Sequence, residues 1–77
     1  MPYERLEDLP NRVRENLPRH AQEIYRSAYN NAWEQYKEPE ERRGAESREE
    51  AAHKVAWAAV KNKYEKNEKS EWVERAA

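Results

Sequence analysis

The sequence predicts a mostly α fold: a compact bundle of three helices, two of them long, to which the N-terminal arm and the C-terminal tail could add a small two-stranded antiparallel sheet. Two stretches, 18–37 and 47–64, repeat apolar residues at helical spacing, and prolines stand close to the expected helix ends. The length of 77 residues predicts a single domain, 1–77. A domain this small has a thin stability margin, because it buries only about 60% of its unfolded surface.

The first part of the chain predicts an arm and a short helix. Residues 2–9 have no helical period, and we expect an extended arm or a short strand there. A short helix should follow from Pro10, since proline suits a first turn that needs no N–H donor. Val13 and Leu17 would share one face of this helix. Leu17 should end it, because the residue before Pro18 is pushed out of the helical conformation.

The second helix should run from Pro18 to about Lys37. Its apolar and aromatic residues recur at i, i+3, i+4 and i+7, which is the pattern of a helix with one buried stripe. These residues are Ala21, Ile24, Tyr25, Ala28, Tyr29, Ala32, Trp33 and Tyr36. Pro39 ends the pattern. The charged segment 38–46, which holds the only glycine, Gly44, is expected to be an exposed connection.

The third helix should begin at Ser47. Ser47 and Glu50 fit a capping box, in which the serine side chain accepts the Glu50 N–H and the carboxylate reaches back. The apolar pattern continues through Ala52, Val55, Ala56, Ala59, Val60 and Tyr64, with Trp57 widening the face, and fades over 62–70. The tail 71–74 alternates loosely between apolar and polar residues. We therefore expect a short strand there, with the N-terminal arm as its partner.

The stock of core residues indicates a tight interface of alanines and aromatic rings. The chain has no Phe but three Trp and five Tyr, and large rings can fill a small core against alanine faces. The predicted core residues are Tyr25, Tyr29, Ala32, Trp33, Ala56, Trp57, Val60 and Tyr64. Among them Ala32, Trp33, Ala56, Trp57 and Val60 are expected to form the contact between the two long helices.

Composition also limits the function. The 15 basic and 16 acidic residues nearly cancel, so no net field draws the chain toward nucleic acid or anionic lipid. There is no cysteine, which excludes disulfides and thiolate metal sites. No apolar run is long enough to cross a bilayer, and the first residues lack the apolar stretch of a signal peptide. We expect a soluble cytoplasmic protein that is not inserted in a membrane.

The sequence offers no evident catalytic or cofactor site. Ser47 has a capping role, and Ser27 and Ser70 lack a His-and-acid arrangement. A single glycine cannot build a phosphate-binding loop. Glu50 and His53 have the Glu-x-x-His spacing of di-iron bundles, but such a site needs more than one unit, and His20 with Glu23 offers only a reversed pair. The prediction is a protein that is not an enzyme, with no metal and no cofactor.

Two basic clusters are candidates for binding. Arg42, Arg43 and Arg48 surround the exposed connection, and we take them as the partner-binding residues. Five lysines line the third helix and its end: Lys54, Lys61, Lys63, Lys66 and Lys69. Beside Trp and Tyr they could grip a phosphate backbone, so a nucleic-acid-binding domain is the alternative function. Lysines at a helix end also simply match the helix dipole, and glutamates between the arginines would repel phosphate.

The arrangement of these residues resembles the ChaB family of bacterial proteins over almost the whole chain. The resemblance rests on Leu9-Pro10, Leu17-Pro18, His20-Ala21-Gln22-Glu23-Ile24-Tyr25, Asn30-Asn31-Ala32-Trp33, Tyr36, Ser47-Arg48-Glu49-Glu50, the run from Ala52 to Lys61, and Tyr64. Two histidines and two Ala-Trp pairs fall in the right order at compatible spacing, which makes the match specific.

The resemblance implies both a fold and a function. It implies helices with a small sheet, and a regulator of cation transport that acts on a calcium (sodium or potassium)/proton antiporter as a soluble accessory protein. The implied partner is therefore the antiporter or another protein. Related domains also occur fused to nucleic-acid-binding modules. No catalytic motif comes with the resemblance, so it assigns no active-site residue.

Overall fold

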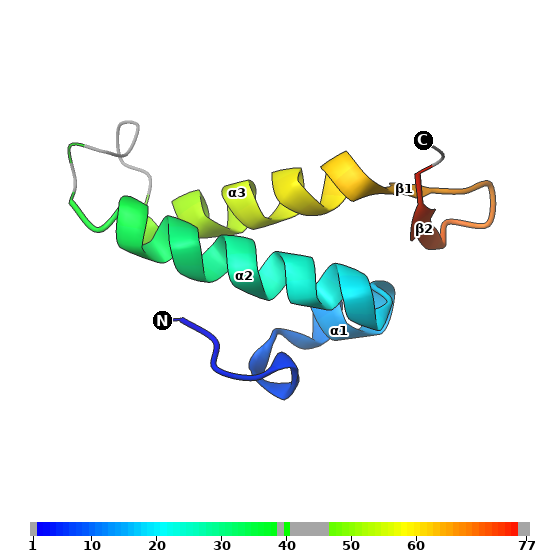
Figure 1. Ribbon diagram of the computed structural model, residues 1–77, viewed down its shortest axis with the longest axis horizontal. Coiled ribbons are helices and arrows are strands. Elements are labelled where there is room, and N and C mark those ends of the chain that lie inside the picture. The colour runs from blue at the N-terminus through cyan, green and yellow to red at the C-terminus, as the bar shows by residue number, and fades with distance from the viewer. Residues whose placement is uncertain (1, 39, 41–46, 76–77) are drawn as a thin grey trace.

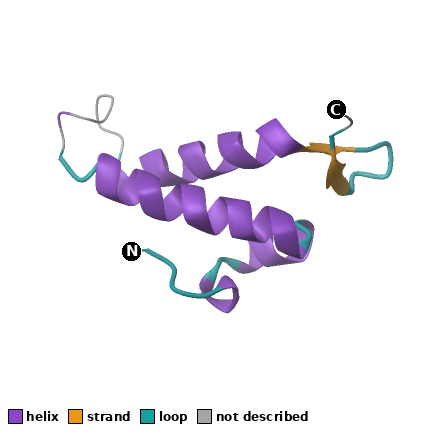
Figure 2. Ribbon diagram, viewed as in Figure 1, coloured by secondary structure: helices purple, strands orange, loops and turns teal. Residues whose placement is uncertain are grey.

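The computed structural model describes residues 2–38, 40 and 47–75, which form four helical segments and two strands (Figures 1 and 2). The elements are η1 (Leu6–Asp8), α1 (Asn11–Asn16), α2 (Arg19–Gln35), α3 (Arg48–Lys63), β1 (Tyr64–Lys66) and β2 (Trp72–Glu74). The two long helices, α2 and α3, lie side by side and run in opposite directions (Figure 1). This arrangement confirms the predicted mostly α fold with a small antiparallel sheet.

Local signals set the ends of the helices. Pro10 and Pro18 occupy the N-cap positions of α1 and α2 with extended backbone. Ser47 caps α3, and its Oγ accepts the backbone N–H of Glu50 at 3.1 Å. The Ser47 hydroxyl also donates to the Glu50 carboxylate at 3.4 Å. The exposed connection predicted for 38–46 lies mostly outside the described residues, as does Pro39.

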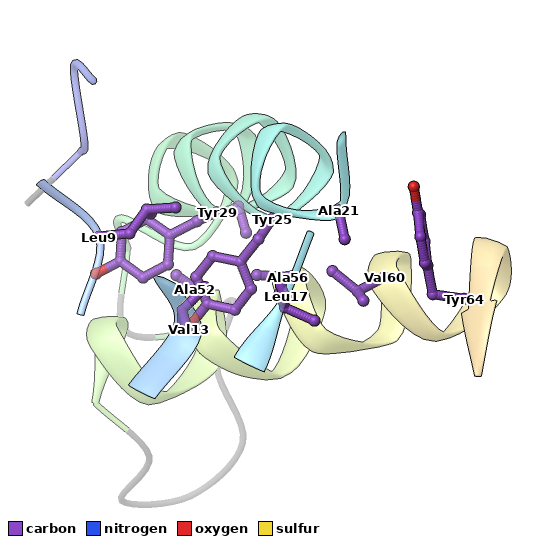
Figure 3. Close-up of a cluster of buried hydrophobic side chains, with 11 residues drawn as sticks. Leu9, Val13, Leu17, Ala21, Tyr25, Tyr29, Ala52, Ala56, Val60 and Tyr64 are labelled. Carbon is purple, nitrogen blue, oxygen red and sulfur yellow. The ribbon is translucent and has the colours of Figure 1, made fainter. Parts of the chain in front are cut away.

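The core lies along the contact between α2 and α3, and residues before α2 close it. Tyr25 and Tyr29 point from α2 toward the alanines of α3, with Leu9 and Val13 beside the rings (Figure 3). The buried hydrophobic residues are Leu9, Val13, Leu17, Ala21, Tyr25, Tyr29, Ala32, Ala51, Ala52, Ala56, Val60 and Tyr64. Small alanine side chains let the helices approach, and the two tyrosine rings fill the remaining space.

The tryptophans expected in this core lie at its border. Trp33 and Trp57 are half-buried and pack against the buried cluster, whereas Ala32 and Ala56, which precede them, are buried. Trp33 stacks on Tyr29 with ring centroids 6.0 Å apart. Trp57 contacts Tyr25 edge-on at 5.4 Å and Trp72 at 5.8 Å. The two large rings therefore cover the edges of the helix contact and leave part of their surface accessible.

The small sheet is a hairpin at the end of α3. The tail does form a strand, β2, but its partner is β1, with Tyr64 opposite Glu74 and Lys66 opposite Trp72. The expected pairing with the N-terminal arm is therefore wrong. The turn is organised by Asn67, whose Oδ1 accepts the backbone N–H groups of Lys69 and Glu71, both at 2.9 Å. This local turn brings β2 back onto β1 before any other segment can pair with it.

The N-terminal arm packs on α2 instead of pairing with a strand. Asn30 holds it from both sides: Oδ1 accepts the Tyr3 N–H at 2.8 Å, and Nδ2 donates to the Tyr3 carbonyl at 2.9 Å. The Tyr3 ring lies on Tyr29, with centroids 4.6 Å apart. Leu6–Asp8 then forms one turn of 3-10 helix, where the sequence had predicted extended chain. The arm thereby covers the Tyr29 side of the buried core.

Candidate binding pocket

Of the arginines predicted to bind a partner, the structure describes Arg48 alone; Arg42 and Arg43 lie outside the described residues. The Arg48 Nε donates to the carbonyl oxygen of Trp33 at 2.8 Å, and its guanidinium lies 4.1 Å from the centre of the Trp33 ring. Arg48 therefore ties the start of α3 to the last turns of α2. A partner would have to compete with these contacts or use only the exposed edge of the guanidinium.

A pocket of about 300 Å³ lies where α1, α2 and α3 meet. Its lining consists of Pro10, Arg12 and Val13 at the start of α1, Tyr25 of α2, and His53 and Trp57 of α3. This volume is at the lower end of the range for small-molecule sites. The spacing of Glu50 and His53 had made His53 a candidate metal ligand. No pattern in the sequence placed Arg12 beside His53, since this proximity depends on how α1 docks.

A hydrogen bond at the pocket connects the two long helices. The Tyr25 hydroxyl and Nδ1 of His53 are hydrogen-bonded partners. The imidazole also packs against the rings of Tyr25 and Tyr29, at centroid distances of 5.9 Å and 5.0 Å. Burial raises the pKa of both tyrosine hydroxyls, so they stay protonated at neutral pH. Tyr25 can therefore donate to a neutral His53.

The surroundings of His53 favour its neutral form. Burial lowers the pKa of the imidazole below 6.5, while the nearby Glu49 carboxylate acts in the opposite direction and Arg12 again lowers the pKa. The His53 Nε2 lies 3.9 Å from Oε1 of Glu49, one turn back along α3. Two side chains alone do not make a metal site. In the part of the chain that the structure describes, no group of three His, Cys, Asp or Glu side chains is placed to hold a metal ion.

Arg12 supplies a positive charge at the pocket. It is exposed, and within residues 2–38, 40 and 47–75 no hydrogen bond or ion pair occupies its guanidinium. Its charge lies near enough to act on the pKa of both Tyr25 and His53. The pocket thus combines apolar and aromatic walls with a cation and an imidazole, and none of its lining residues is a carboxylate.

The second histidine forms a similar cross-connection at the other end of the helix pair. His20, in the first turn of α2, has Nδ1 3.1 Å from the hydroxyl of Tyr64, the first residue of β1. The Glu74 carboxylate on β2 lies 3.9 Å from the same nitrogen. Each histidine therefore meets a buried tyrosine from the opposite part of the fold. The His53–Tyr25 and His20–Tyr64 pairs join residues far apart in the sequence, so only the packing of α2 on α3 reveals them.

The lysines considered for nucleic-acid binding are all exposed. Lys66 lies over the Trp72 ring, with Nζ 5.7 Å from its centre. The hairpin also carries exposed carboxylates, Glu65, Glu68, Glu71 and Glu74, interleaved with the lysines. The charges on this surface are mixed in sign, which weakens the attraction for a phosphate backbone.

Comparison with known proteins identifies the family. The family model ChaB matches residues 9–75, which is most of the chain. The chain belongs to the ChaB family. It is 54% identical over 76 residues to the protein named "putative cation transport regulator ChaB" in Escherichia coli K12 and to the protein of the same name in Shigella flexneri, covering 99% of this chain and 100% of each relative. The resemblance found in the sequence is confirmed.

A solved structure from the ChaB family has the same fold. The solved structure described as "NMR solution structure of the putative cation transport regulator ChaB" superposes with a TM-score of 0.80 at 53% identity, covering 97% of this chain and 100% of that chain. The overall fold is therefore shared with this relative. Within the described residues, no helix combines the length and apolar character needed to span a membrane.

Proposed function

We propose that this protein is a small non-enzymatic regulator of cation transport that acts by binding a cation/proton antiporter at its cytoplasmic side. The observation that carries the proposal is the 54% identity, over the full length of the relative, to proteins named "putative cation transport regulator ChaB". An antiporter that exchanges calcium, or sodium or potassium, for protons is the partner that the sequence resemblance implies.

The chemistry of the pocket supports binding over catalysis. A catalytic tyrosine or histidine needs a pKa tuned toward the working pH and a free position facing the substrate. Burial moves the pKa of Tyr25 away from neutrality, and the hydroxyl is already bonded to His53. Arg12 is the exposed cation of the lining, and its guanidinium suits an anchor for an anion and not an acid or a base.

The surface around the connection is the proposed contact with the antiporter. Arg48 is a poor probe of this contact, because it holds Trp33 and its substitution would also disturb the fold. The double variant Arg42→Glu/Arg43→Glu is therefore the sharper test. A matched control with the same change of charge is Arg5→Glu/Arg19→Glu, since the side chains of Arg5 and Arg19 are 69% and 84% exposed.

The experiment is a tagged capture from detergent-solubilised membranes, with and without nuclease, read by mass spectrometry. We expect a cation antiporter to be recovered with the wild-type protein and the control, whether or not nuclease is present, and to be lost with the Arg42/Arg43 variant. Recovery dominated by nuclease-sensitive material, with capture that falls steeply as salt rises, would instead support the nucleic-acid alternative. Equal antiporter recovery by all three proteins would place the contact elsewhere on the surface.

A further inference from the structure

The pocket between α1, α2 and α3 has the chemistry of a site for an apolar anion. Pro10, Val13, Tyr25 and Trp57 provide hydrocarbon and aromatic walls, while Arg12 and His53 provide the polar groups. Small-molecule sites commonly have this composition, with mostly apolar walls and a few polar groups that fix the orientation of the ligand. The walls come from three separate helices, so the hollow is a product of the tertiary fold.

The charges at the pocket select the sign of the ligand. Arg12 is the lining residue that carries a full charge at neutral pH, and no described side chain neutralises it. The Glu49 carboxylate approaches the Nε2 atom of His53 and opposes Arg12 in its effect on the pKa of both His53 and Tyr25, but Glu49 is not among the lining residues. A cation entering the hollow would meet Arg12 without a compensating carboxylate in the walls. A carboxylate, by contrast, matches the planar fork of the guanidinium.

The size and the walls of the pocket limit the rest of the ligand. A volume of about 300 Å³ holds a single ring or a branched aliphatic group with one carboxylate, but not an extended peptide. An inorganic phosphate would leave the apolar walls of Val13 and Trp57 unused, and it would gain only one strong donor group. An aromatic group would meet Trp57, whose ring is half-buried and already pairs edge-on with Tyr25.

We propose that this pocket binds a small organic monocarboxylate with an aromatic or branched apolar body, held by Arg12 at its carboxylate and by Trp57 and Val13 at its hydrocarbon part. The site would give the protein a means of responding to a metabolite of this class. The proposal does not depend on the identity of the transport partner, because none of the arginines proposed to contact that partner is among the lining residues of the pocket.

The test is a titration of the ¹⁵N-labelled protein followed by two-dimensional NMR. Phenylacetate is the probe, and phenylacetamide, which has the same ring without the charge, is its matched control. We expect saturable shifts in the Trp57 indole N–H and in the amides near Arg12 and His53 with the acid. The amide should bind at least about tenfold more weakly, the loss expected when a charge-assisted hydrogen bond is removed.

Two variants on the same helix locate the anchor. Arg12→Gln should weaken phenylacetate binding about tenfold or more, whereas Arg14→Gln should leave it unchanged, because Arg14 lies outside this pocket and contacts Asn11. Both arginines are exposed, so both variants should fold, as their unperturbed spectra would show.

The proposal is overturned if phenylacetate gives no saturable shifts, if phenylacetamide binds equally well, or if Arg12→Gln and Arg14→Gln have the same effect. A further arm uses the dipeptide Gly-Phe, which presents an apolar carboxylate at the end of a peptide. Binding of Gly-Phe with shifts that extend well beyond the pocket, together with no binding of phenylacetate, would assign the site to a protein C-terminus and would also overturn the proposal.

Discussion

Replacing Val60 by alanine tests whether the contact between α2 and α3 holds the fold. Val60 is 0% exposed, so the loss of two methyl groups removes about 1.6 kcal/mol of transfer free energy, at about 0.8 kcal/mol each. A cavity that closes only in part adds about 1 kcal/mol. Because alanine has a higher helix propensity than valine, the substitution also stabilises the helix by about 0.5 kcal/mol. We expect the free energy of unfolding to fall by about 2 kcal/mol.

The assay is urea unfolding followed by far-ultraviolet circular dichroism. A domain of this size has a free energy of unfolding on the order of 4–11 kcal/mol, so the loss is a large share of the total. The corresponding fall in Tm is about 8–16 °C. Val73→Ala is the matched control: Val73 on β2 is 39% exposed, and we expect a change of about 0.5 kcal/mol or less. Equal losses for the two variants would refute the reasoning, because stability would then not depend on burial between the helices.

Three further predictions follow from the cap and from the buried rings. Ser47→Ala should lower the free energy of unfolding by about 1 kcal/mol, because the Glu50 N–H loses its acceptor. Ser27 is exposed, so Ser27→Ala is the control that should not destabilise the protein, and urea unfolding compares the two variants. An NMR titration should give a pKa below 6.5 for His53 in the folded protein. The unfolded chain then binds more protons than the folded chain, so stability should fall as pH drops from 6.5 toward the folded-state pKa. A pKa at or above 6.5 would contradict this prediction. Burial raises the pKa of Tyr25 and Tyr29, so both should still be protonated above pH 10.0, and stability should fall as pH rises through this value. Circular dichroism would follow the fold, and NMR would follow the ring signals of these two tyrosines; ionisation of both rings near pH 10.0 in the intact fold would contradict the prediction.

The ends of the helices could be predicted from the sequence because short-range chemistry sets them. Pro10 and Pro18 fix the backbone before α1 and α2, and the Ser47 side chain binds an N–H only three residues away. The buried stripe of α2 was equally accessible, since the helical period places Tyr25 and Tyr29 on one face whatever the partner helix is.

The partner of the C-terminal strand could not be predicted in this way. The arm was the expected partner, whereas the stretch 62–70 showed no strand pattern of its own, and strand pairing depends on which turn forms. The deciding residue is Asn67, whose side chain binds two backbone N–H groups and closes the hairpin. Asn67, which precedes Glu68-Lys69-Ser70, is a turn signal. It lies within 62–70, which had been interpreted only as the fading end of the third helix.

The pocket was inaccessible to sequence reasoning for a geometric reason. Helical period shows that Trp57 and His53 lie near the edge of a buried stripe, but it does not show which neighbour covers that edge. The neighbour is α1, a helix of six residues, Asn11–Asn16, whose docking depends on Val13 entering the core. The direction in which α1 leaves Pro10 places Arg12 beside His53, and no pattern along the chain encodes that proximity.

Only some of the residues that line the pocket also belong to the family resemblance. This partial overlap decides which variants can test ligand binding separately from folding. His53 and Trp57 belong to the Ala52–Lys61 run of the resemblance and also line the pocket, but they brace Tyr25 as well. Their substitution would change folding and binding together. Arg12 is outside that set, is exposed, and has no described ion pair to lose. A change at Arg12 therefore alters the charge of the pocket while leaving the helix contact in place, which makes it the residue that can separate the function of this site from the stability of the fold.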